Sequence, residues 1–216
     1  NELLHIQSVF SHLAASEDTG QDEFTILQFN RFESMAKFIQ SKTNHQVIKH
    51  ILNSAGISRF PKFQFDMVRL GMGLYGYSSI EEEQNKLHNI NCLKSTITQI
   101  KKIEMGESVG YGRAFIAKDN LSIATIPIGY ADGIHRFLGN GNFQMTIHGK
   151  LAKTIGHICM DMCMLDISGI DCKEGDEVLV FDTQTQLNEI AKKGNTIPYE
   201  ILTGISQRVR RIYFKE

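Results

Sequence analysis

The chain has 216 residues, of which 42% are hydrophobic and 22% charged, and its formal net charge is −1. This composition fits one large or two small domains with a hydrophobic core, and the absence of a basic block argues against a nucleic-acid partner. The apolar runs are short and interrupted by polar residues, so no membrane-spanning segment is predicted.

Residues 1–90 alternate between strand and helix patterns. The chain begins without an initiator Met, and residues 6–15 are predicted to be a buried strand entering a loop. Apolar spacing of about 3.6 residues predicts a helix over 24–42, and 46–52 and 65–76 are predicted strands before a polar linker at 78–89. Strand, helix and strand with short joins predict a parallel sheet or a β/α barrel.

Residues 91–216 change to a period of two, which predicts a mostly antiparallel β domain. A short helix is predicted over 185–194, with Gly194 as its C-cap. The predicted strands cover residues 95–105, 121–130, 143–149, 162–168, 176–182 and 208–214.

The first candidate site follows the strand at 46–52. In "HILNSAG", the polar residues His50, Asn53 and Ser54 come at the end of that strand. Backbone N–H groups and a hydroxyl placed there suit an anion. An ordinary polar loop is the alternative, and these residues alone favour it.

Arg69 lies within the apolar stretch "FDMVRLGMGLYG". A buried arginine must be paired, and Gly71 and Gly73 would let a ligand approach the backbone closely. A structural ion pair with a carboxylate is an equally good interpretation of Arg69.

The four cysteines are Cys92, Cys159, Cys163 and Cys172. Strand alternation would put Cys159 and Cys163 on one face, which favours buried core thiols over a zinc site, so no metal is predicted. Without a visible secretory signal, we expect reduced thiols in a cytoplasmic protein.

Two tyrosines stand beside glycines. In "SVGYGRAF", Tyr111 lies between Gly110 and Gly112, which predicts a strand with two close-approach glycines. A phosphate loop is an alternative, whereas a channel filter needs a membrane segment that is absent from the sequence. In "PIGYADG", Tyr130 precedes a predicted turn at Asp132-Gly133.

These motifs, taken in order, resemble those of the alanine racemase family. The resemblance implies a pyridoxal-phosphate (PLP) barrel domain in residues 1–90, a C-terminal β domain in 91–216, and a head-to-tail homodimer. It also implies interconversion of L- and D-alanine for peptidoglycan by two-base proton transfer. The stretches that carry it are "VFSHLAASED", "HILNSAG", "FDMVRLGMGLYG", "ESVGYGRAF", "PIGYADG", "GHICMDMCMLDI" and "YEILTGISQRVRR".

The resemblance also implies roles for particular residues. Arg69 matches the donor to the PLP ring nitrogen, and a guanidinium keeps its proton at any relevant pH, so the ring would stay a weak electron sink. In the second domain, Tyr111 matches a catalytic base that acts on the partner subunit's cofactor. A tyrosine has an ordinary pKa of about 10, so such a base needs neighbouring positive charge or donors. The remaining implied contacts are His50 and His12 near the ring; Ser54, Asn53, Tyr199 and the backbone of Gly71 and Met72 at the phosphate; and the Met160 N–H, Tyr130 and Asp161 on the substrate side.

The sequence departs from the family pattern in two ways. Arg210 stands where the family usually has Pro, and the motifs of the PLP-binding lysine and of the barrel arginine for the substrate carboxylate do not occur. We therefore expect the chain to begin near the last three of the eight strand repeats of the barrel and to be inactive alone. Open alternatives are a racemase for serine or for several amino acids, a racemase module fused to a cell-wall ligase, and a non-enzymatic module.

Overall fold

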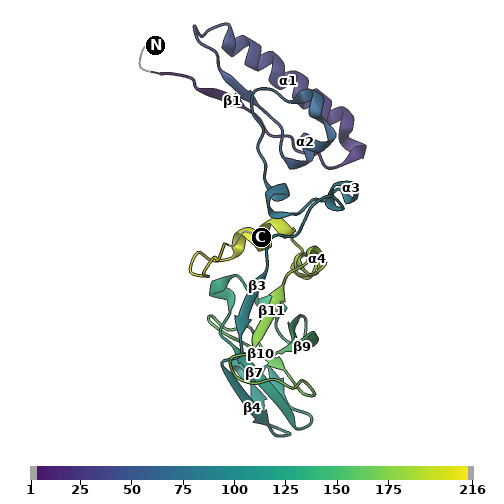
Figure 1. The fold of residues 1–216 in the computed structure, drawn as a ribbon, viewed down its shortest axis with the longest axis vertical. Coiled ribbons are helices and arrows are strands. Elements are labelled where there is room, and N and C mark those ends of the chain that lie inside the picture. The colour runs from purple at the N-terminus through teal and green to yellow at the C-terminus, as the bar shows by residue number, and fades with distance from the viewer. Residues whose placement is uncertain (1–3, 214–216) are drawn as a thin grey trace. The chain divides into compact units, whose positions relative to one another are not determined.

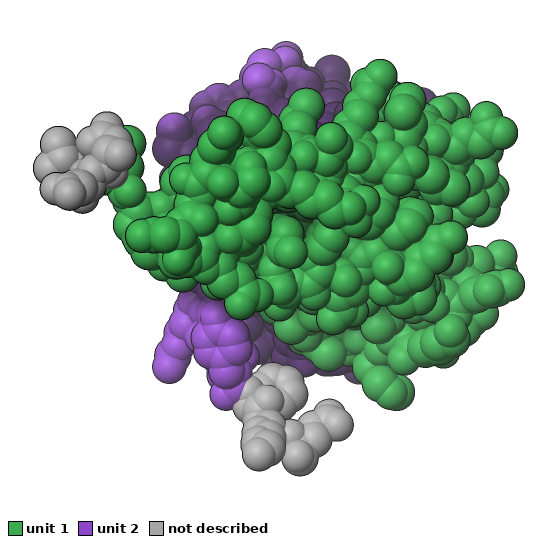
Figure 2. All heavy atoms as spheres, turned by 90° about the horizontal axis from the view of Figure 1, so that it is seen from above, with its two compact units in different colours: residues 1–90 green, residues 91–216 purple. Residues whose placement is uncertain are grey.

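The computed structural model describes residues 4–213. The chain divides into two compact units, Asn1–Ile90 and Asn91–Glu216, coloured separately in Figure 2. We call them unit 1 and unit 2 and describe each by itself. Within the described residues, no helix has both the length and the apolar character needed to cross a membrane.

Unit 1 is built on a strand–helix–strand crossover, as predicted. Strands β1 (Ser8–Phe10) and β2 (Ile48–His50) pair in parallel, and helix α1 (Asp22–Gln40) connects them (Figure 1). Burial of Phe29 and Phe32 on α1 forms a core with residues that follow the strands. Those residues are Leu13, Ile51, Leu52 and Phe60.

The helix period was predicted correctly, but most of the apolar residues that revealed it face away from the core. Met35 and Phe38 are each 65% exposed, whereas Phe29 and Phe32 are buried. The aromatic partners of α1 explain this choice of face, because Phe29 stacks on Phe63 with ring centroids 3.8 Å apart. The predicted buried strand at 6–15 is also wrong in part: only 8–10 forms a strand, and Phe10 is 66% exposed.

The predicted third strand at 65–76 does not form. The Asp66 and Arg69 amides donate to the carbonyls of Lys49 and Leu52, but no continuous ladder follows. The Asp66 carboxylate accepts from the Lys49 N–H at 2.8 Å and so occupies a donor that a neighbouring strand would use. Instead, unit 1 continues through α2 (Ser54–Arg59), 3₁₀ turns at Pro61–Phe63 and Met72–Tyr75, and the short helix α3 (Glu81–Gln84).

Unit 2 contains a seven-stranded antiparallel sheet with the order β3-β11-β8-β9-β10-β7-β4. Strands β3 and β4 are consecutive in sequence but occupy opposite ends of this order. The Ile97 N–H donates to the Asp176 carbonyl beside β11, whereas the next N–H, that of Thr98, donates to the Thr125 carbonyl of β7. The predicted strand at 95–105 is therefore split into β3 and β4, and the sheet curls. The strands are β3 (Leu93–Thr96), β4 (Gln99–Ile103), β7 (Leu121–Ile126), β8 (Gln144–Ile147), β9 (Lys150–Ile155), β10 (Cys163–Asp166) and β11 (Glu177–Phe181).

Strand β9 was not predicted. It pairs with β8 through a two-residue hairpin in which His148 and Gly149 have φ of 47° and 76°. Two positive φ values in a row are the conformation that fits the twist of paired strands. A His in that position gave no turn signal in the sequence.

The end of unit 2 is helical and then irregular. Helix α4 (Gln184–Lys193) ends at Gly194, as predicted, and α5 (Pro198–Gly204) follows it. Residues 208–213 form no strand, contrary to prediction, and residue 214 lies outside the described residues. The Arg211 guanidinium donates to the carbonyls of Ile205, Ser206 and Val209, so the segment folds around its own arginine instead of joining a sheet.

Candidate active site

Arg69 is the centre of a polar cluster in unit 1. One terminal nitrogen, Nη1, donates to His50 Nδ1 at 2.7 Å. The other, Nη2, donates to the Ser11 carbonyl at 2.7 Å and lies 3.3 Å from His12 Nδ1. The guanidinium also lies over the ring of Phe10, 5.3 Å from its centroid. Arg69 is half-buried in an irregular segment, not in a strand.

Among the described residues, the partners of Arg69 leave its positive charge without a counter-charge. They are carbonyl oxygens and imidazole nitrogens, so the alternative ion pair with a carboxylate does not form among residues 4–213. No hydrogen bond engages its Nε there, and the Nε–H remains available as a donor. The Nε–H can therefore donate a hydrogen bond to an acceptor atom of a ligand.

His50 is held in its neutral form. It is 6% exposed, and burial, followed by the Arg69 charge, lowers its pKa below the ordinary value. Because Nδ1 accepts from a guanidinium that cannot give up its proton, the imidazole proton is assigned to Nε2. The ring stacks on Phe10 at 5.2 Å between centroids.

This lowered pKa predicts a pH dependence of stability. Above about pH 6.5, the ordinary value, His50 is neutral in both states, so its contribution is fully present. As the pH falls from there through the folded pKa, the unfolded state takes up the proton first and stability is lost. Urea unfolding from pH 7.5 to 5 should show this loss and His50→Gln should flatten it; an unchanged slope in the variant would refute it.

Ser54 and Gly71 form a small polar cradle in the same unit. Ser54 Oγ accepts from the Gly71 N–H at 2.9 Å and from the Gly73 N–H at 3.4 Å. Its own hydroxyl hydrogen has no acceptor within the described residues, so it can donate to an anion. The Asn53 side chain, predicted to lie at the phosphate, already has structural partners. It caps α2 by accepting from the Gly56 N–H, and it accepts from Ser16 Oγ at 2.8 Å.

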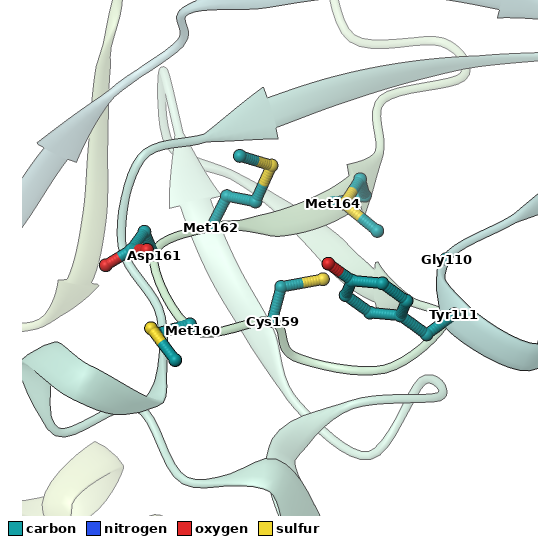
Figure 3. A pocket seen from close by; sticks show the side chains of 7 residues that line it. All are labelled: Gly110, Tyr111, Cys159, Met160, Asp161, Met162 and Met164. Carbon is teal, nitrogen blue, oxygen red and sulfur yellow. The ribbon is translucent and has the colours of Figure 1, made fainter.

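The second candidate centre is a hollow of about 440 Å³ in unit 2 (Figure 3). Tyr111 lies on one side of it, and Met160 and Asp161 lie on the other. The remaining lining residues are Gly110, Cys159, Met162 and Met164. The hollow thus combines a phenol and a carboxylate with a mostly apolar, sulfur-rich wall.

Tyr111 lies on a turn, which corrects the predicted strand. Strands β5 (Ser108–Val109) and β6 (Phe115–Ile116) pair, and Tyr111–Arg113 is a 3₁₀ turn between them. The flanking Gly110 and Gly112 have φ of 81° and 67°, a region that favours glycine. Their first function is therefore to shape the turn, which leaves the Tyr111 side chain 76% exposed.

The loop that carries Met160 is attached to the turn that carries Tyr130. Tyr130 N and Ala131 N donate to the carbonyls of Cys159 and Met160, each at 3.0 Å. A Cβ on Gly129 would lie 2.3 Å from the Cys159 oxygen, so only glycine allows this approach. Within the described residues the Met160 N–H donates no hydrogen bond, and it remains available to an anion.

A charged cluster beside this loop was not predicted from the sequence. Arg208 Nε donates to Asp132 Oδ1 at 2.7 Å, and Arg208 Nη2 donates to Asp161 Oδ1 at 2.6 Å. Burial raises the pKa of Asp132, but the Arg208 hydrogen bond and the Gly129 N–H outweigh it and hold that pKa below its ordinary value. The sequence offered only the Asp-Gly turn as a signal, and nothing in it pointed to Arg208.

The other predicted residues lie as follows. Tyr199 is on α5 in unit 2 and is 41% exposed; its contact with a phosphate stays a prediction. All four cysteines are free. Cys163 is buried, as predicted, and burial raises its pKa to about 12, whereas Cys159 is only half-buried in the loop. No cluster of three or more metal-ligating side chains occurs among residues 4–213.

Comparison with known proteins accounts for both units. Residues 1–79 match the family model for the alanine racemase N-terminal domain, and residues 90–213 match the C-terminal domain. Alanine racemase 2 of Caldanaerobacter subterraneus subsp. tengcongensis is 39% identical over 98% of this chain and 56% of its own length. The chain thus spans about half the length of the curated relatives that it matches.

Solved structures show the same relationship. The alanine racemase of Clostridium difficile 630 aligns with a TM-score of 0.85 at 36% identity, over 96% of this chain and 55% of that one. The Bartonella henselae alanine racemase, solved with covalently bound pyridoxal phosphate, has a TM-score of 0.77 at 31% identity, over 99% and 58% respectively. The fold is therefore part of a barrel domain followed by a curled antiparallel β domain, and the chain belongs to the alanine racemase family.

Proposed function

We propose that the protein is a PLP-dependent alanine racemase, which interconverts L- and D-alanine. The observation that carries the proposal is the hollow of unit 2, where the Tyr111 phenol and the Met160 backbone line one cavity and the Met160 N–H donates to no group among residues 4–213. A base and an N–H that can donate to an anion, placed at one cavity, suit an amino acid, whose carboxylate is held while its α-proton is moved.

The residues of unit 1 fit PLP. No hydrogen bond from another described residue engages Arg69 Nε, and we propose that its N–H donates to the pyridine nitrogen. Ser54, whose hydroxyl hydrogen has no acceptor in the part of the chain that the structure describes, would donate to a phosphate oxygen next to the backbone of Gly71 and Met72. When bound, PLP supplies the electron withdrawal that acidifies the α-carbon of an amino acid. His12, beside Arg69, would lie near the ring, and Asn53 would support the phosphate site from its capping position.

The chemistry of this chain's own groups follows from their positions. We propose that Tyr111 takes or returns the α-proton on one face of the substrate and that the Met160 N–H holds its carboxylate. Tyr130 and Asp161 would line the entrance. Racemisation also needs a base on the opposite face, and the family resemblance assigns it to a lysine whose motif does not occur in these 216 residues.

We further propose that the enzyme is a homodimer whose Tyr111 acts at the partner subunit's cofactor, and that it supplies D-alanine for peptidoglycan in the cytoplasm. The family resemblance supports the dimer. Four free cysteines suit a reducing compartment.

The test is an assay of the full gene product. The purified protein is loaded with PLP and incubated with L-alanine, and both enantiomers are quantified on a chiral column. We expect D-alanine to accumulate until the two are equal, because enantiomers have the same free energy in water. A parallel incubation with L-serine sets the substrate preference. No D-alanine from a PLP-loaded protein would refute the proposal.

A further inference from the structure

Three segments of unit 2 that are distant in sequence meet beside the Tyr111 hollow. They are the turn at 129–133, the loop at 159–162 and the segment at 204–208. The Ser206 N–H donates to the Asp132 carbonyl at 3.1 Å, and a Cβ on Gly133 would lie 2.8 Å from the Gly204 oxygen. The backbones are therefore in direct contact, and side chains from all three segments can interact.

Arg208 connects these segments through charge. It belongs to the third segment, and it donates to Asp132 of the turn and to Asp161 of the loop through different nitrogens. Asp132 is already fixed, since its other oxygen accepts from the Gly129 N–H at 2.8 Å. Asp161 is exposed, and within the described residues Arg208 is the partner of its carboxylate.

Asp161 directly follows Met160, whose N–H would hold the substrate carboxylate, and both line the hollow. An uncompensated Asp161 would place a negative charge on the residue next to the N–H that must bind another negative charge, and like charges repel. The Arg208 guanidinium compensates that charge and bridges Asp161 and Asp132. With that charge neutralised, an anion can bind at the loop at 159–162 without repulsion from Asp161.

From this geometry we propose that Arg208 is a positioning residue for substrate binding: it neutralises Asp161 and so allows an amino-acid carboxylate to reach the Met160 N–H. This inference rests on the proposed function, because it assigns the specificity of the same hollow for a carboxylate. Arg208 would act through Asp161 and would not touch the substrate.

The kinetic test uses the PLP-loaded full gene product. We expect Arg208→Met to raise KM for alanine about 5- to 10-fold with little change in kcat, because a screened charge repulsion of this kind acts on binding. The double variant Arg208→Met/Asp161→Asn should return KM to within about two-fold of the native value. Arg208→Lys, which keeps the charge, should fall between the native protein and Arg208→Met.

The control is Arg210→Met, which removes an exposed positive charge two residues further along and should leave KM unchanged. A merely structural function of Arg208 predicts a different pattern: a lower melting temperature and no rescue by Asp161→Asn. An unchanged KM in Arg208→Met, or a double variant as impaired as the single one, would overturn the proposal.

A second measurement separates this inference from the proposed function. Acetate is titrated into protein carrying ¹⁵N-labelled methionine, and the Met160 amide resonance is followed. We expect weaker acetate binding in Arg208→Met and recovery in the double variant, whether or not the protein turns over alanine. Absence of racemase activity would refute the proposed function alone, whereas equal acetate affinity in all variants would refute the Arg208 assignment.

Discussion

Replacing Tyr111 by Phe should lower the racemisation rate by about 10²- to 10⁴-fold, the usual contribution of a positioned acid–base group. The change removes only a hydroxyl from a side chain that is 76% exposed. Stability and PLP binding should therefore stay near native values, because substitutions away from packed regions change stability by only a few tenths of a kcal/mol. The measurements are chiral turnover in both directions, PLP absorbance and thermal unfolding.

Tyr213→Phe is the matched control, since Tyr213 is also exposed, at 91%, and lies outside the hollow. It should leave turnover unchanged.

A second measurement of the Tyr111 function is the exchange of the substrate α-proton with solvent. If Tyr111 serves one face of the substrate, the variant should still exchange the α-proton of one enantiomer faster than that of the other. Near-native racemisation by Tyr111→Phe would remove Tyr111 from the mechanism.

Replacing Arg69 by Lys should weaken PLP binding about 10- to 100-fold, the equivalent of about 1.5–3 kcal/mol for a hydrogen bond that involves a charged group. Lys keeps the charge but lacks the planar set of donors. It cannot serve His50, the Ser11 carbonyl and the pyridine nitrogen together. A lysine can also give up a proton to the ring, so the variant should form more side products, such as pyridoxamine phosphate, per racemisation event.

The control for Arg69 is Arg59→Lys in the same unit. Arg59 also makes two short bonds, to the Ser16 carbonyl and to Asp22, both at 2.6 Å, and we have assigned it no contact with PLP. PLP titration followed by absorbance should show a loss of affinity for Arg69→Lys only. Equal losses in both variants would mean that unit 1 responds to any lost arginine and that Arg69 has no special function.

The sequence predicted the larger elements of both units because apolar periodicity is local. It could not give the buried face of α1, since either face satisfies the period and the choice depends on Phe63 and Phe65, which follow in sequence. The strand predicted at 65–76 failed for a related reason. The segment has the apolar pattern of a strand, but the Asp66 side chain accepts from the Lys49 N–H, which a neighbouring strand would use. Strand propensities do not include such a side-chain contact.

In the candidate site, too, local features were predictable from the sequence, whereas contacts between distant residues were not. Arg69 contacts His50, and Ser54 contacts the Gly71 backbone; the contacts of these residues with a cofactor stay predictions. The position of Tyr111 on a turn depends on two positive φ values, which a Gly-Tyr-Gly string permits but does not require. The Arg208 contacts were not visible because they join residues 47 and 76 positions apart, and no local motif around Arg208 indicates either partner.

The curl of the unit 2 sheet has a consequence for how the chain folds during synthesis. Strand β3 begins at residue 93, but its hydrogen-bonding partner β11 begins at residue 177. The ribosome must therefore make most of the unit, up to residue 181, before its first strand can pair. Pairings between such distant residues slow folding, and the waiting edge of β3 is open to other chains. Unit 1 differs, because β1 needs only the residues up to β2, which ends at residue 50. Unit 2 should therefore be the slower to fold and the more dependent on chaperones.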